Sequence, residues 1–428
     1  MEFQTLKKSH LKRNIIIGIL VVGIISAVVL NFTRAKYRTT ESIPLANGTI
    51  NYELSDLNLI GVYIEDGNDY TKVDKIPDSG YTFNNERSYC KIGDEKQDMT
   101  ITYDMNTKTL NIAPMTTKGT KCYLYFDEQK ILLADAIKRD NQINSGTPNF
   151  ASVATTDEGV YKTQDDWGDS YYFRGAVTNN WLKFAGYYWR IIRINGDGSI
   201  RLIYNGTSTA TTGDSTMINS SQAFNSSYNR SEYVGYMYTS SQQHGNTTNS
   251  SIKGVLDSWY SSNLASYADK ISKEAGFCGD RDLKSGSWSS TGSTLYYAAY
   301  GRLIDNKAPT LKCSNSSDLY TTSSSSKGNK VLTNPVGLIT ADEVSMAGGV
   351  YGQNNTSYYL YNNEYYWTMS PCYFNAANSY AVVFAVHSGG RLVATGVNLA
   401  DGVRPVINLS ADVTAKSGNG TSSTPYEI

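Results

Sequence analysis

The sequence predicts an α+β protein in which strands outnumber helices, and three observations lead to this prediction. An apolar run near the N-terminus, residues 15–33, is just long enough to cross a membrane as one helix. The next segment, residues 42–127, alternates apolar and polar residues with the period of antiparallel strands. The remainder, residues 160–428, mixes short strand-like runs, a few helical patches and polar loops.

The bulk composition excludes one class of partner. The chain has 428 residues, enough for two or three units that each bury a core. Its formal net charge is -1 and only 18% of its residues are charged, so no general basic field exists to hold nucleic acid. Tyrosine (34) is far more frequent than phenylalanine (11), which suits polar contact surfaces on exposed β-structure.

The N-terminal apolar run is interpreted as a signal anchor. Basic residues lie on both sides of the run, so the charge bias favours a cytoplasmic N-terminus only weakly. This interpretation gives a cytoplasmic tail (1–14), a single membrane helix (15–33) and an extracellular remainder. A cleaved signal peptide competes with it, although no small-x-small site follows the run cleanly. A prepilin helix is a third interpretation, although the run lacks an early glutamate.

All five cysteines follow the predicted anchor, where an extracellular compartment permits disulfides. Their distribution suggests two pairs, each inside one predicted domain, although sequence alone cannot establish connectivity. The suggested pairs are Cys90 with Cys122 and Cys278 with Cys313, which leaves Cys372 over. No CxxC motif or Cys/His cluster of zinc spacing is present, so no metal site is predicted.

Residues 42–127 are expected to form a small Ig-like β-sandwich that Cys90 and Cys122 join. Its simplest role is that of a spacer between the membrane and the next domain. Residues 128–159 follow as a short helix (128–139) and a polar linker. The strand-like runs of the sandwich are residues 49–54, 59–64, 99–103, 109–112 and 121–126, with a hairpin-like turn at 104–108.

Residues 160–428 are expected to form one larger α+β domain. Its clearest element is a hairpin whose strands, 187–194 and 199–204, flank an Asn-Gly-Asp-Gly turn. The polar segments 206–251 and 314–328 are expected to be extended surface loops. A further strand is predicted at 181–184, and helices are predicted around 252–267 and 340–347.

The most informative stretch runs from Tyr365 to Leu409. It opens with YYWTMSP, continues through strand-like runs at 380–387 and 391–397, and closes with GVRPVINL. These blocks resemble the C-type-lectin-type fold related to formylglycine-generating proteins. More narrowly, they resemble surface proteins of Firmicutes-like gut bacteria and the variable proteins that retroelements diversify. With YYWRIIRINGDGSIRLIY and GLITADEV, the resemblance covers about 160–428.

The resemblance implies a fixed scaffold that displays variable side chains to a ligand. The scaffold would include Trp367, Gly402, Arg404 and Pro405. The display positions would be Tyr373, Asn375, Ala385, His387, Arg391, Val393, Thr395, Asn398 and Asp401. From Cys372 to Asp401 the chain has no Lys, Glu, Gln, Met or Trp, as adenine-directed mutagenesis of Asn codons would produce. A chance shortage in an ordinary β-rich segment explains this equally well.

Two acidic pairs, a histidine and an arginine have side chains of the types that catalysis can use. The acidic pairs Asp165–Asp166 and Asp280–Asp282 have the residue type that glycoside hydrolysis needs, but solvated loops explain them by default. His387 has no catalytic partner that the sequence can identify. Arg404 is expected to be a buried structural residue that donates to backbone carbonyls. No catalytic residue, cofactor or copper-binding cysteine pair is therefore predicted.

These observations predict a membrane-anchored extracellular binding or adhesion protein whose ligand is a protein or a carbohydrate at the cell surface. The fold resemblance is an analogy as far as function is concerned. Two alternatives remain: an extracellular enzyme that acts on glycans or the cell envelope, and a structural surface or stalk protein.

Overall fold

The computed structural model describes residues 50–51, 58–77, 80–105, 107–113 and 120–428. The predicted cytoplasmic tail (1–14) and membrane anchor (15–33) lie outside these residues. Among the described residues, no helix is long and apolar enough to cross a membrane. The chain is a mixed α+β protein made mostly of strands, and it divides into two compact units, the first ending at Gln129 and the second starting at Lys130.

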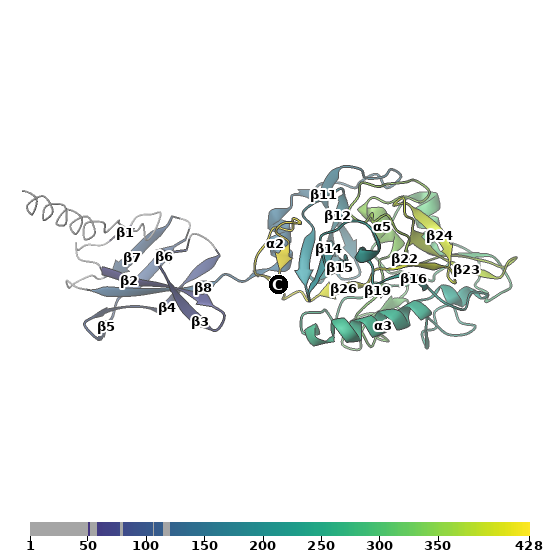
Figure 1. The fold of residues 1–428 in the computed structure, drawn as a ribbon. Coiled ribbons are helices and arrows are strands. Elements are labelled where there is room, and N and C mark those ends of the chain that lie inside the picture. Colours follow the sequence, from purple (N-terminus) through teal and green to yellow (C-terminus); the bar gives the residue numbers. More distant parts are fainter. Residues whose placement is uncertain (1–49, 52–57, 78–79, 106, 114–119) are drawn as a thin grey trace, which may run out of the picture. The chain divides into compact units, whose positions relative to one another are not determined.

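The first unit has two sheets that share one core (Figure 1). One sheet has the strand order β3-β2-β8-β4-β5, and the other has the order β1-β7-β6. The strands are β1 (Ile50–Asn51), β2 (Asn58–Asp66), β3 (Asp69–Val73), β4 (Tyr81–Ile92), β5 (Glu95–Gln97), β6 (Thr100–Asp104), β7 (Thr109–Ala113) and β8 (Lys121–Glu128).

Alternation along the strands builds this core. In β8, Cys122, Leu124 and Phe126 are fully buried, while the residues between them point to the opposite face. The Cys90–Cys122 disulfide joins residues that pair directly across β4 and β8, which confirms the suggested pairing. The strands predicted at 59–64, 99–103, 109–112 and 121–126 are also confirmed.

The second unit contains two larger sheets. The first has the order β10-β11-β12-β14-β13-β28, with β15 pairing to β14 and β26; the second has the order β16-β25-β22-β23-β24, with β20 pairing to β22. The strands of these sheets are β10 (Ile143–Asn144), β11 (Asp157–Asp165), β12 (Gly168–Gly175), β13 (Trp181–Phe184), β14 (Tyr187–Ile194), β15 (Ile200–Tyr204), β16 (Asn219–Ala223), β20 (Leu295–Tyr296), β22 (Tyr366–Asn375), β23 (Tyr380–Val386), β24 (Leu392–Gly396), β25 (Ala400–Val403), β26 (Val406–Leu409) and β28 (Tyr426–Glu427).

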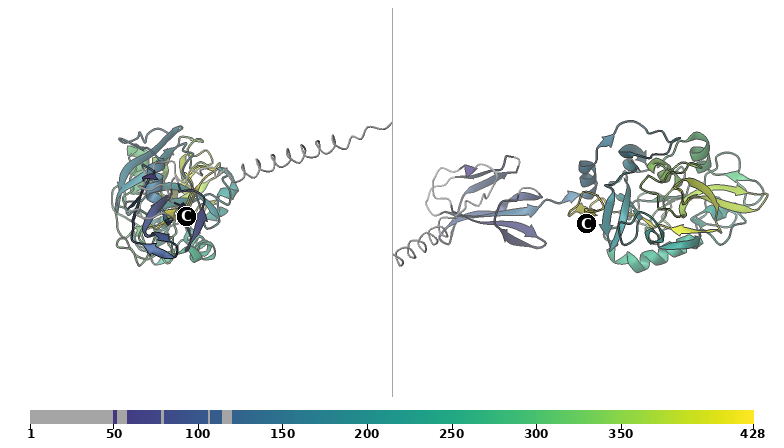
Figure 2. Two further views of the ribbon diagram at one scale, coloured as in Figure 1. Left: turned by 90° about the vertical axis from the view of Figure 1, so that its left-hand side faces the viewer. Right: turned by 45° about the horizontal axis from the view of Figure 1, so that its top comes forward.

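Short strands and helices complete the unit. The helix α3 runs along one edge, at the bottom of Figure 1 and again in the right-hand view of Figure 2. The helices are α2 (Leu133–Asp140), α3 (Ser251–Asn263), α4 (Ala298–Tyr300) and α5 (Ala341–Ala347), with the single turns η1 (Asp214–Thr216), η2 (Ser231–Val234), η3 (Ala265–Tyr267) and η4 (Gly301–Asn306). Three two-stranded ladders pair β9 (Ile131–Leu132) with β27 (Thr414–Ala415), β17 (Met237–Tyr238) with β18 (Thr248–Asn249), and β19 (Phe277–Cys278) with β21 (Leu319–Tyr320).

Local sequence explains two of these elements well. The predicted hairpin is confirmed as β14 and β15, and Gly196 in its turn lies so close to the backbone of Gly168 that a Cβ would stand 2.4 Å from the Gly168 nitrogen. The predicted helix at 340–347 is confirmed as α5. Thr340 and Glu343 form a capping box at its start, in which each side chain accepts a hydrogen bond from the other residue's backbone N–H.

Two expectations differ from the structure. The helix expected at 128–139 begins only at Leu133, because residues 131–132 pair as β9 with β27, and it buries Leu133 and Ile137 in the core of the second unit. The segments 206–251 and 314–328 were both expected to be extended surface loops, but the first buries Phe224 and Tyr236 completely and the second buries Tyr320. Isolated apolar residues between serines and asparagines therefore anchor a segment whose average composition is polar.

Candidate functional site

Five side chains lie next to one another across one end of the second sheet, and we call them the cross-strand row. Pairing places them in register: Tyr366 pairs with both Gly402 and Val386, and Val386 pairs with Leu392. Paired residues share a face of the sheet, and the residues beside them share the opposite face. The row consists of Gln222 on β16, Asp401 on β25, Tyr365 just before β22, His387 just after β23 and Arg391 just before β24.

Tyr365 is the most exposed member of the row. Its side chain is 39% exposed, and its ring lies 4.4 Å from the His387 imidazole, centroid to centroid. Gln222, His387 and Arg391 are half-buried. The row therefore presents an aromatic face together with several polar groups, which is the mixture that adaptable contact surfaces use.

His387 is held in one orientation by its own turn. The backbone N–H of Gly389 donates to Nδ1 at 2.8 Å, so the neutral imidazole carries its proton on Nε2. Burial, together with the positive charge of Arg391, lowers the pKa of His387 from its ordinary value. At neutral pH the side chain is thus uncharged and offers one N–H donor.

Arg391 holds its guanidinium at the rim of the row. One of its amino groups donates to the side-chain oxygen of Asn354. In the part of the chain that the structure describes, Arg391 has no carboxylate partner. Most of its donors are therefore available to an anionic or hydrogen-bond-accepting ligand.

Asp401 is the most unusual member of the row. Its side chain is only 8% exposed, and no described residue donates a hydrogen bond to the buried Oδ2. Burial raises the pKa of this carboxyl to about 6. A carboxyl without donors is costly to bury in its charged form. A ligand that donates a hydrogen bond to it would therefore gain more binding free energy than from the same hydrogen bond on the open surface.

The other predicted display positions lie in three places. Val393 and Thr395 share the face of the row, and Val393 is half-buried while Thr395 is 9% exposed. Asn398 is exposed in the turn before β25. Ala385, which pairs with Val393, is completely buried, so its expected role as a display residue is wrong. Ala385 also pairs with Trp367 of β22, and the two side chains lie on the same face of the sheet.

Tyr373 and Asn375 lie on the opposite face, because a double irregularity in β22 reverses which residues face each side. Tyr373 pairs with Tyr296 of β20, and their rings lie 6.2 Å apart. Tyr296 lies 4.6 Å from Tyr300 in turn. The predicted display positions therefore do not form one surface: the row and the Tyr373 cluster are separated by the sheet.

The predicted structural residues are buried as expected. Trp367 donates from its ring nitrogen to the backbone oxygen of Gln222 at 2.6 Å, which ties β22 to β16 beneath the row. A Cβ on Gly402 would stand 2.0 Å from the Met217 sulfur, so the chain needs glycine there. Pro405, also buried, accepts a hydrogen bond from the backbone of Tyr204.

Arg404 has the structural role that the sequence predicted. Its guanidinium is 1% exposed and donates to the backbone oxygens of Tyr204 and Leu360, each at 3.1 Å. It also donates to the side-chain oxygen of Asn205 at 3.1 Å. All three acceptors belong to the protein, so this guanidinium is not free to clamp a ligand.

The cysteines behave as the sequence suggested. The Cys278–Cys313 disulfide is present, and Cys372 is a free, buried thiol whose pKa burial raises. Among the described residues, no group of three or more His, Cys, Asp or Glu side chains could hold a metal ion. The described residues of the row thus contain no such metal-binding group.

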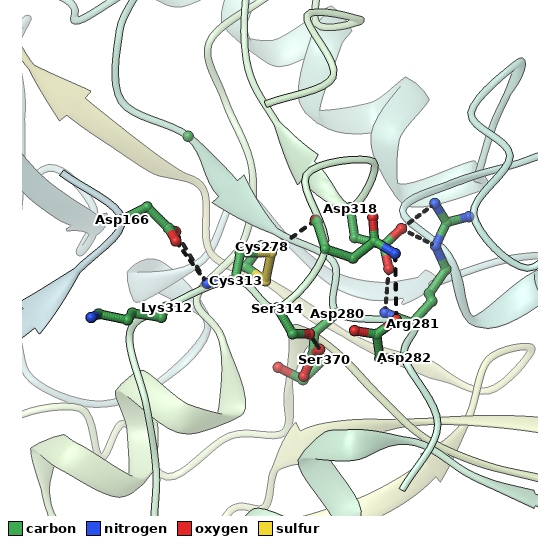
Figure 3. The surroundings of a disulfide bond; sticks show 12 residues. Asp166, Cys278, Asp280, Arg281, Asp282, Lys312, Cys313, Ser314, Asp318 and Ser370 are labelled. Carbon is green, nitrogen blue, oxygen red and sulfur yellow. Dashed lines mark hydrogen bonds and ion pairs between the residues drawn. A yellow bond between two sulfur atoms is a disulfide. The ribbon is translucent and has the colours of Figure 1, made fainter. Parts of the chain in front are cut away.

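The acidic pairs lie around the Cys278–Cys313 disulfide (Figure 3). Asp166 and Asp280 line one pocket there, and burial raises the pKa of each. Asp280 pairs with Arg302 at 2.5 Å, and Asp165 pairs with Arg193 at 2.5 Å. Asp166 instead accepts from the backbone N–H of Cys313. This pocket holds a network of charges that largely neutralise one another.

The sequence missed two residues of the row, Gln222 and Tyr365, and the supporting Asn354. Tyr365 was visible as the first residue of the YYW block, where its neighbours are buried. Gln222 lies 179 positions before its partner Asp401 (401 − 222), and only the pairing of β16 with β25 brings them together.

Comparison with known proteins found no match. No protein-family model, curated protein or solved structure resembles the chain closely enough to count as similar. The function is therefore argued from the residues themselves.

Proposed function

We propose that the protein is a ligand-binding or adhesion protein whose second unit binds through the cross-strand row. The observation that carries this proposal is the row itself, in which an exposed tyrosine and a neutral histidine lie beside an arginine and a buried carboxyl. Among the described residues, the arginine has no carboxylate partner and the carboxyl Oδ2 has no donor. These groups offer stacking, donor and acceptor functions on one surface. Their ligand is a protein or a carbohydrate at the cell surface.

The chemistry of the row favours binding over catalysis. The Tyr365 and His387 rings contact each other at a tilted angle, and among the described residues no hydrogen bond joins His387 to Asp401. General acid–base catalysis needs such a partner in reach. A rigid aromatic residue flanked by adaptable polar side chains is instead a common composition of recognition surfaces.

A C-type-lectin-like fold for the second unit is part of the proposal. The arrangement of β22, β23, β24 and β25 in one sheet with the buried Trp367 and Arg404 supports it, because these strands hold the YYWTMSP block, the runs at 380–387 and 391–397 and the start of GVRPVINL. The rest of GVRPVINL is β26, which pairs with β15 of the other sheet. The first unit would be an Ig-like sandwich. Both assignments go beyond the mixed α+β class.

Diversification of the row is the finer part of the proposal. The half-buried and exposed positions His387, Arg391, Val393 and Asn398 would vary, while the buried Trp367 would not. Sequencing this gene segment across closely related cells tests the idea. Substitutions in these four codons at positions where a nearby template repeat has adenine support it. An invariant segment without a template repeat nearby rejects diversification while leaving binding open.

We also propose that both described units lie outside the cell, anchored to the membrane by residues 15–33. The two disulfides support this location, since such bonds persist in oxidising compartments. Protease added to intact cells should remove both units. Protection of the chain from the protease would contradict an extracellular location.

Binding itself is tested by screening the full chain against arrays of purified glycans and extracellular proteins. The double substitution Tyr365→Ala with Arg391→Ala should weaken the strongest interaction at least about tenfold, roughly 1.4 kcal/mol. The matched control is Tyr267→Ala with Arg230→Ala, because Tyr267 is 39% exposed and Arg230 is similarly accessible. An unchanged affinity of the first variant, or the lack of any ligand on both arrays, would reject the proposal.

One observation favours a second candidate, an enzyme that acts on glycans of the cell envelope. Asp166 and Asp280 line a single pocket, and a carboxyl with a raised pKa is suited to act as a general acid. Hydrolysis of cell-wall polysaccharide by the chain, abolished by Asp166→Asn, would support this candidate. Activity that survives the substitution, or no activity at all, would exclude it.

A further inference from the structure

The outer face of the five-stranded sheet in the first unit carries a band of tyrosines. The opposite face of this sheet contributes Val62, Leu124 and Phe126 to the core. Pairing places the tyrosines together, since Tyr63 pairs with Tyr125, and Tyr89 pairs with Tyr123. We call this surface the tyrosine face; its tyrosines are Tyr63, Tyr70, Tyr89, Tyr123 and Tyr125.

The rings of the tyrosine face form one continuous band. Tyr63 and Tyr125 are stacked with centroids 4.9 Å apart, and Tyr89 and Tyr123 are stacked at the same distance. Tyr70 contacts Tyr125 edge-on at 5.1 Å, and Tyr63 lies 6.4 Å from Tyr123. The band therefore crosses four neighbouring strands, β3, β2, β8 and β4, a width of about 15 Å at the usual strand spacing.

Positive charge surrounds this band. The Arg87 guanidinium lies 4.6 Å from the centre of the Tyr70 ring, and the Lys96 ammonium lies 5.2 Å from that of Tyr89. Three lysines pair with one another across β5, β4 and β8, which extends the positive surface beyond the rings. The five cations of the tyrosine face are Lys72, Arg87, Lys91, Lys96 and Lys121.

The carboxylates of the same face are already occupied. Asp127 accepts from the Tyr70 hydroxyl and from the Asn84 amide, and Glu65 accepts from the backbone N–H of Glu128 at 2.9 Å. Four of the cations against two carboxylates leave the paired strand positions with a charge of +2, in a chain whose formal net charge is -1. The fifth cation, Arg87, lies in the irregular part of β4 beside Glu86. Among the described residues, only Lys91 of these five cations has an ion-pair partner, the exposed Asp94.

We propose that the tyrosine face binds an anionic polysaccharide, one whose sugar units carry carboxylate or phosphate groups. The excess positive charge selects an anion. The rings are half-buried and so partly accessible, and their apolar surface and hydroxyls can contact sugars. The linear band suits an extended polymer. The first unit thus binds a ligand in addition to spacing the second unit from the membrane, independently of the function proposed for the cross-strand row.

A lipid surface fits this face less well. The described part of the first unit exposes no large apolar side chain, and a membrane-binding surface ordinarily inserts such side chains between the headgroups. Anionic vesicles therefore serve as a competing arm of the test.

The experiment measures binding of the full chain to polygalacturonate, with neutral dextran of similar length as the comparison. We expect binding to polygalacturonate that weakens as salt is raised, and no binding to dextran. The triple substitution Lys91→Gln, Lys96→Gln and Lys121→Gln should lower the affinity about tenfold at low salt. Tyr123→Phe with Tyr125→Phe retains the stacking and removes two hydroxyls, and should lower it several-fold.

The matched control changes the same number of charges in the second unit: Lys162→Gln, Lys183→Gln and Lys270→Gln, whose side chains are 47–53% exposed. Affinity of this control within twofold of the unmodified chain supports the proposal. An equal loss in both triple variants, or no binding to polygalacturonate, would overturn it. Binding to phosphatidylglycerol vesicles is the last measurement. Each triple variant is compared with the unmodified chain, so that any contribution of the N-terminal apolar run cancels. If the Lys91, Lys96 and Lys121 variant loses more affinity for the vesicles than for polygalacturonate, the face binds lipid instead.

Discussion

At the scale of single residues, Asp401 has a feature that stability measurements can detect. The carboxyl is buried without a donor to its Oδ2, and burial raises its pKa to about 6 from an ordinary value near 3.8. The folded chain therefore binds this proton more tightly than the unfolded chain. Ionisation of Asp401 costs stability as pH rises from about 4 to 6, and the full cost, about 2 to 3 kcal/mol, remains above pH 6.

Asp401→Asn should remove this cost, because an amide carries no charge. We expect the variant to be more stable than the unmodified chain at pH 7.5, by up to about 2 kcal/mol, and nearly equal to it at pH 4. Urea unfolding of the second unit at both pH values measures the difference. A variant that is less stable at pH 7.5 would show that the charged carboxylate has donors in solution.

Arg404 illustrates the opposite case, a buried charge that donates three hydrogen bonds to acceptors of the protein. Arg404→Lys should destabilise the second unit by about 2 to 3 kcal/mol, since one ammonium cannot reach three acceptors that lie around a planar guanidinium. Thermal unfolding checks this expectation. Arg230→Lys, at a position whose side chain is 41% exposed, is the control and should change stability by no more than about 0.5 kcal/mol. Equal effects of both substitutions would argue against a structural role for Arg404.

At the scale of elements, the cross-strand row combines two ionisable groups whose pKa values are shifted in opposite directions by burial. At pH 8 its charges cancel, because Arg391 is positive, Asp401 is negative and His387 is neutral. Near pH 5 Asp401 is largely protonated, so the charge approaches +1. The pKa of His387 is lowered from its ordinary value, so its protonation adds a further positive charge only at still lower pH.

This change predicts pH-dependent binding at the row. An anionic ligand should bind more tightly at pH 5 than at pH 8, by about tenfold, and a cationic ligand should bind more weakly. Calorimetric titration at the two pH values with a ligand from the arrays measures the effect. His387→Gln combined with Asp401→Asn should flatten the dependence; an equally steep dependence in that variant would place the titrating groups elsewhere.

The Cys278–Cys313 disulfide closes a loop with a sequence separation of 35 residues. Replacing both cysteines by serine should destabilise the second unit by about 3 to 4 kcal/mol, since the unfolded chain regains the freedom that the loop restricts. Chemical denaturation measures this loss. Cys372→Ser, which removes no disulfide, is the comparison. If it lowers the free energy of unfolding as much as the double variant does, the effect comes from burying a hydroxyl and not from opening the loop.

The sequence predicted most of the elements around the site but not their arrangement. The runs at 380–387 and 391–397 were recognised because alternation and a Ser-Gly-Gly turn define a hairpin locally, and they are β23 and β24. The irregularity in β22 has no comparable local signal. It moves Tyr373 to the opposite face of the sheet, and the side on which a residue lies depends on such one-residue shifts.

At the scale of the whole molecule, the chain has two units with separate cores. Units with their own cores unfold as separate cooperative bodies. Scanning calorimetry should therefore resolve two transitions, and Cys90→Ser with Cys122→Ser should lower only one of them. A single transition that shifts as a whole would show that the units stabilise each other.

The tyrosine face of the first unit could not be predicted from the sequence, for a physical reason. Composition and alternation identified the first unit as β-structure, but they gave no sign of the tyrosine face. Its rings come from β2, β3, β4 and β8, and only strand pairing shows that they lie on one side. A surface assembled from several strands cannot be read from any one of them.

The most direct test of binding at the cross-strand row is amide hydrogen exchange of the full chain, with and without the ligand that the arrays identify. We predict slower exchange on binding at residues 387–391 and 400–402 and around Tyr365, with no change near residues 278–282 and 310–318. Protection confined to the latter segments, which surround the disulfide and Asp280, would contradict binding at the row and would assign the ligand to the charged pocket.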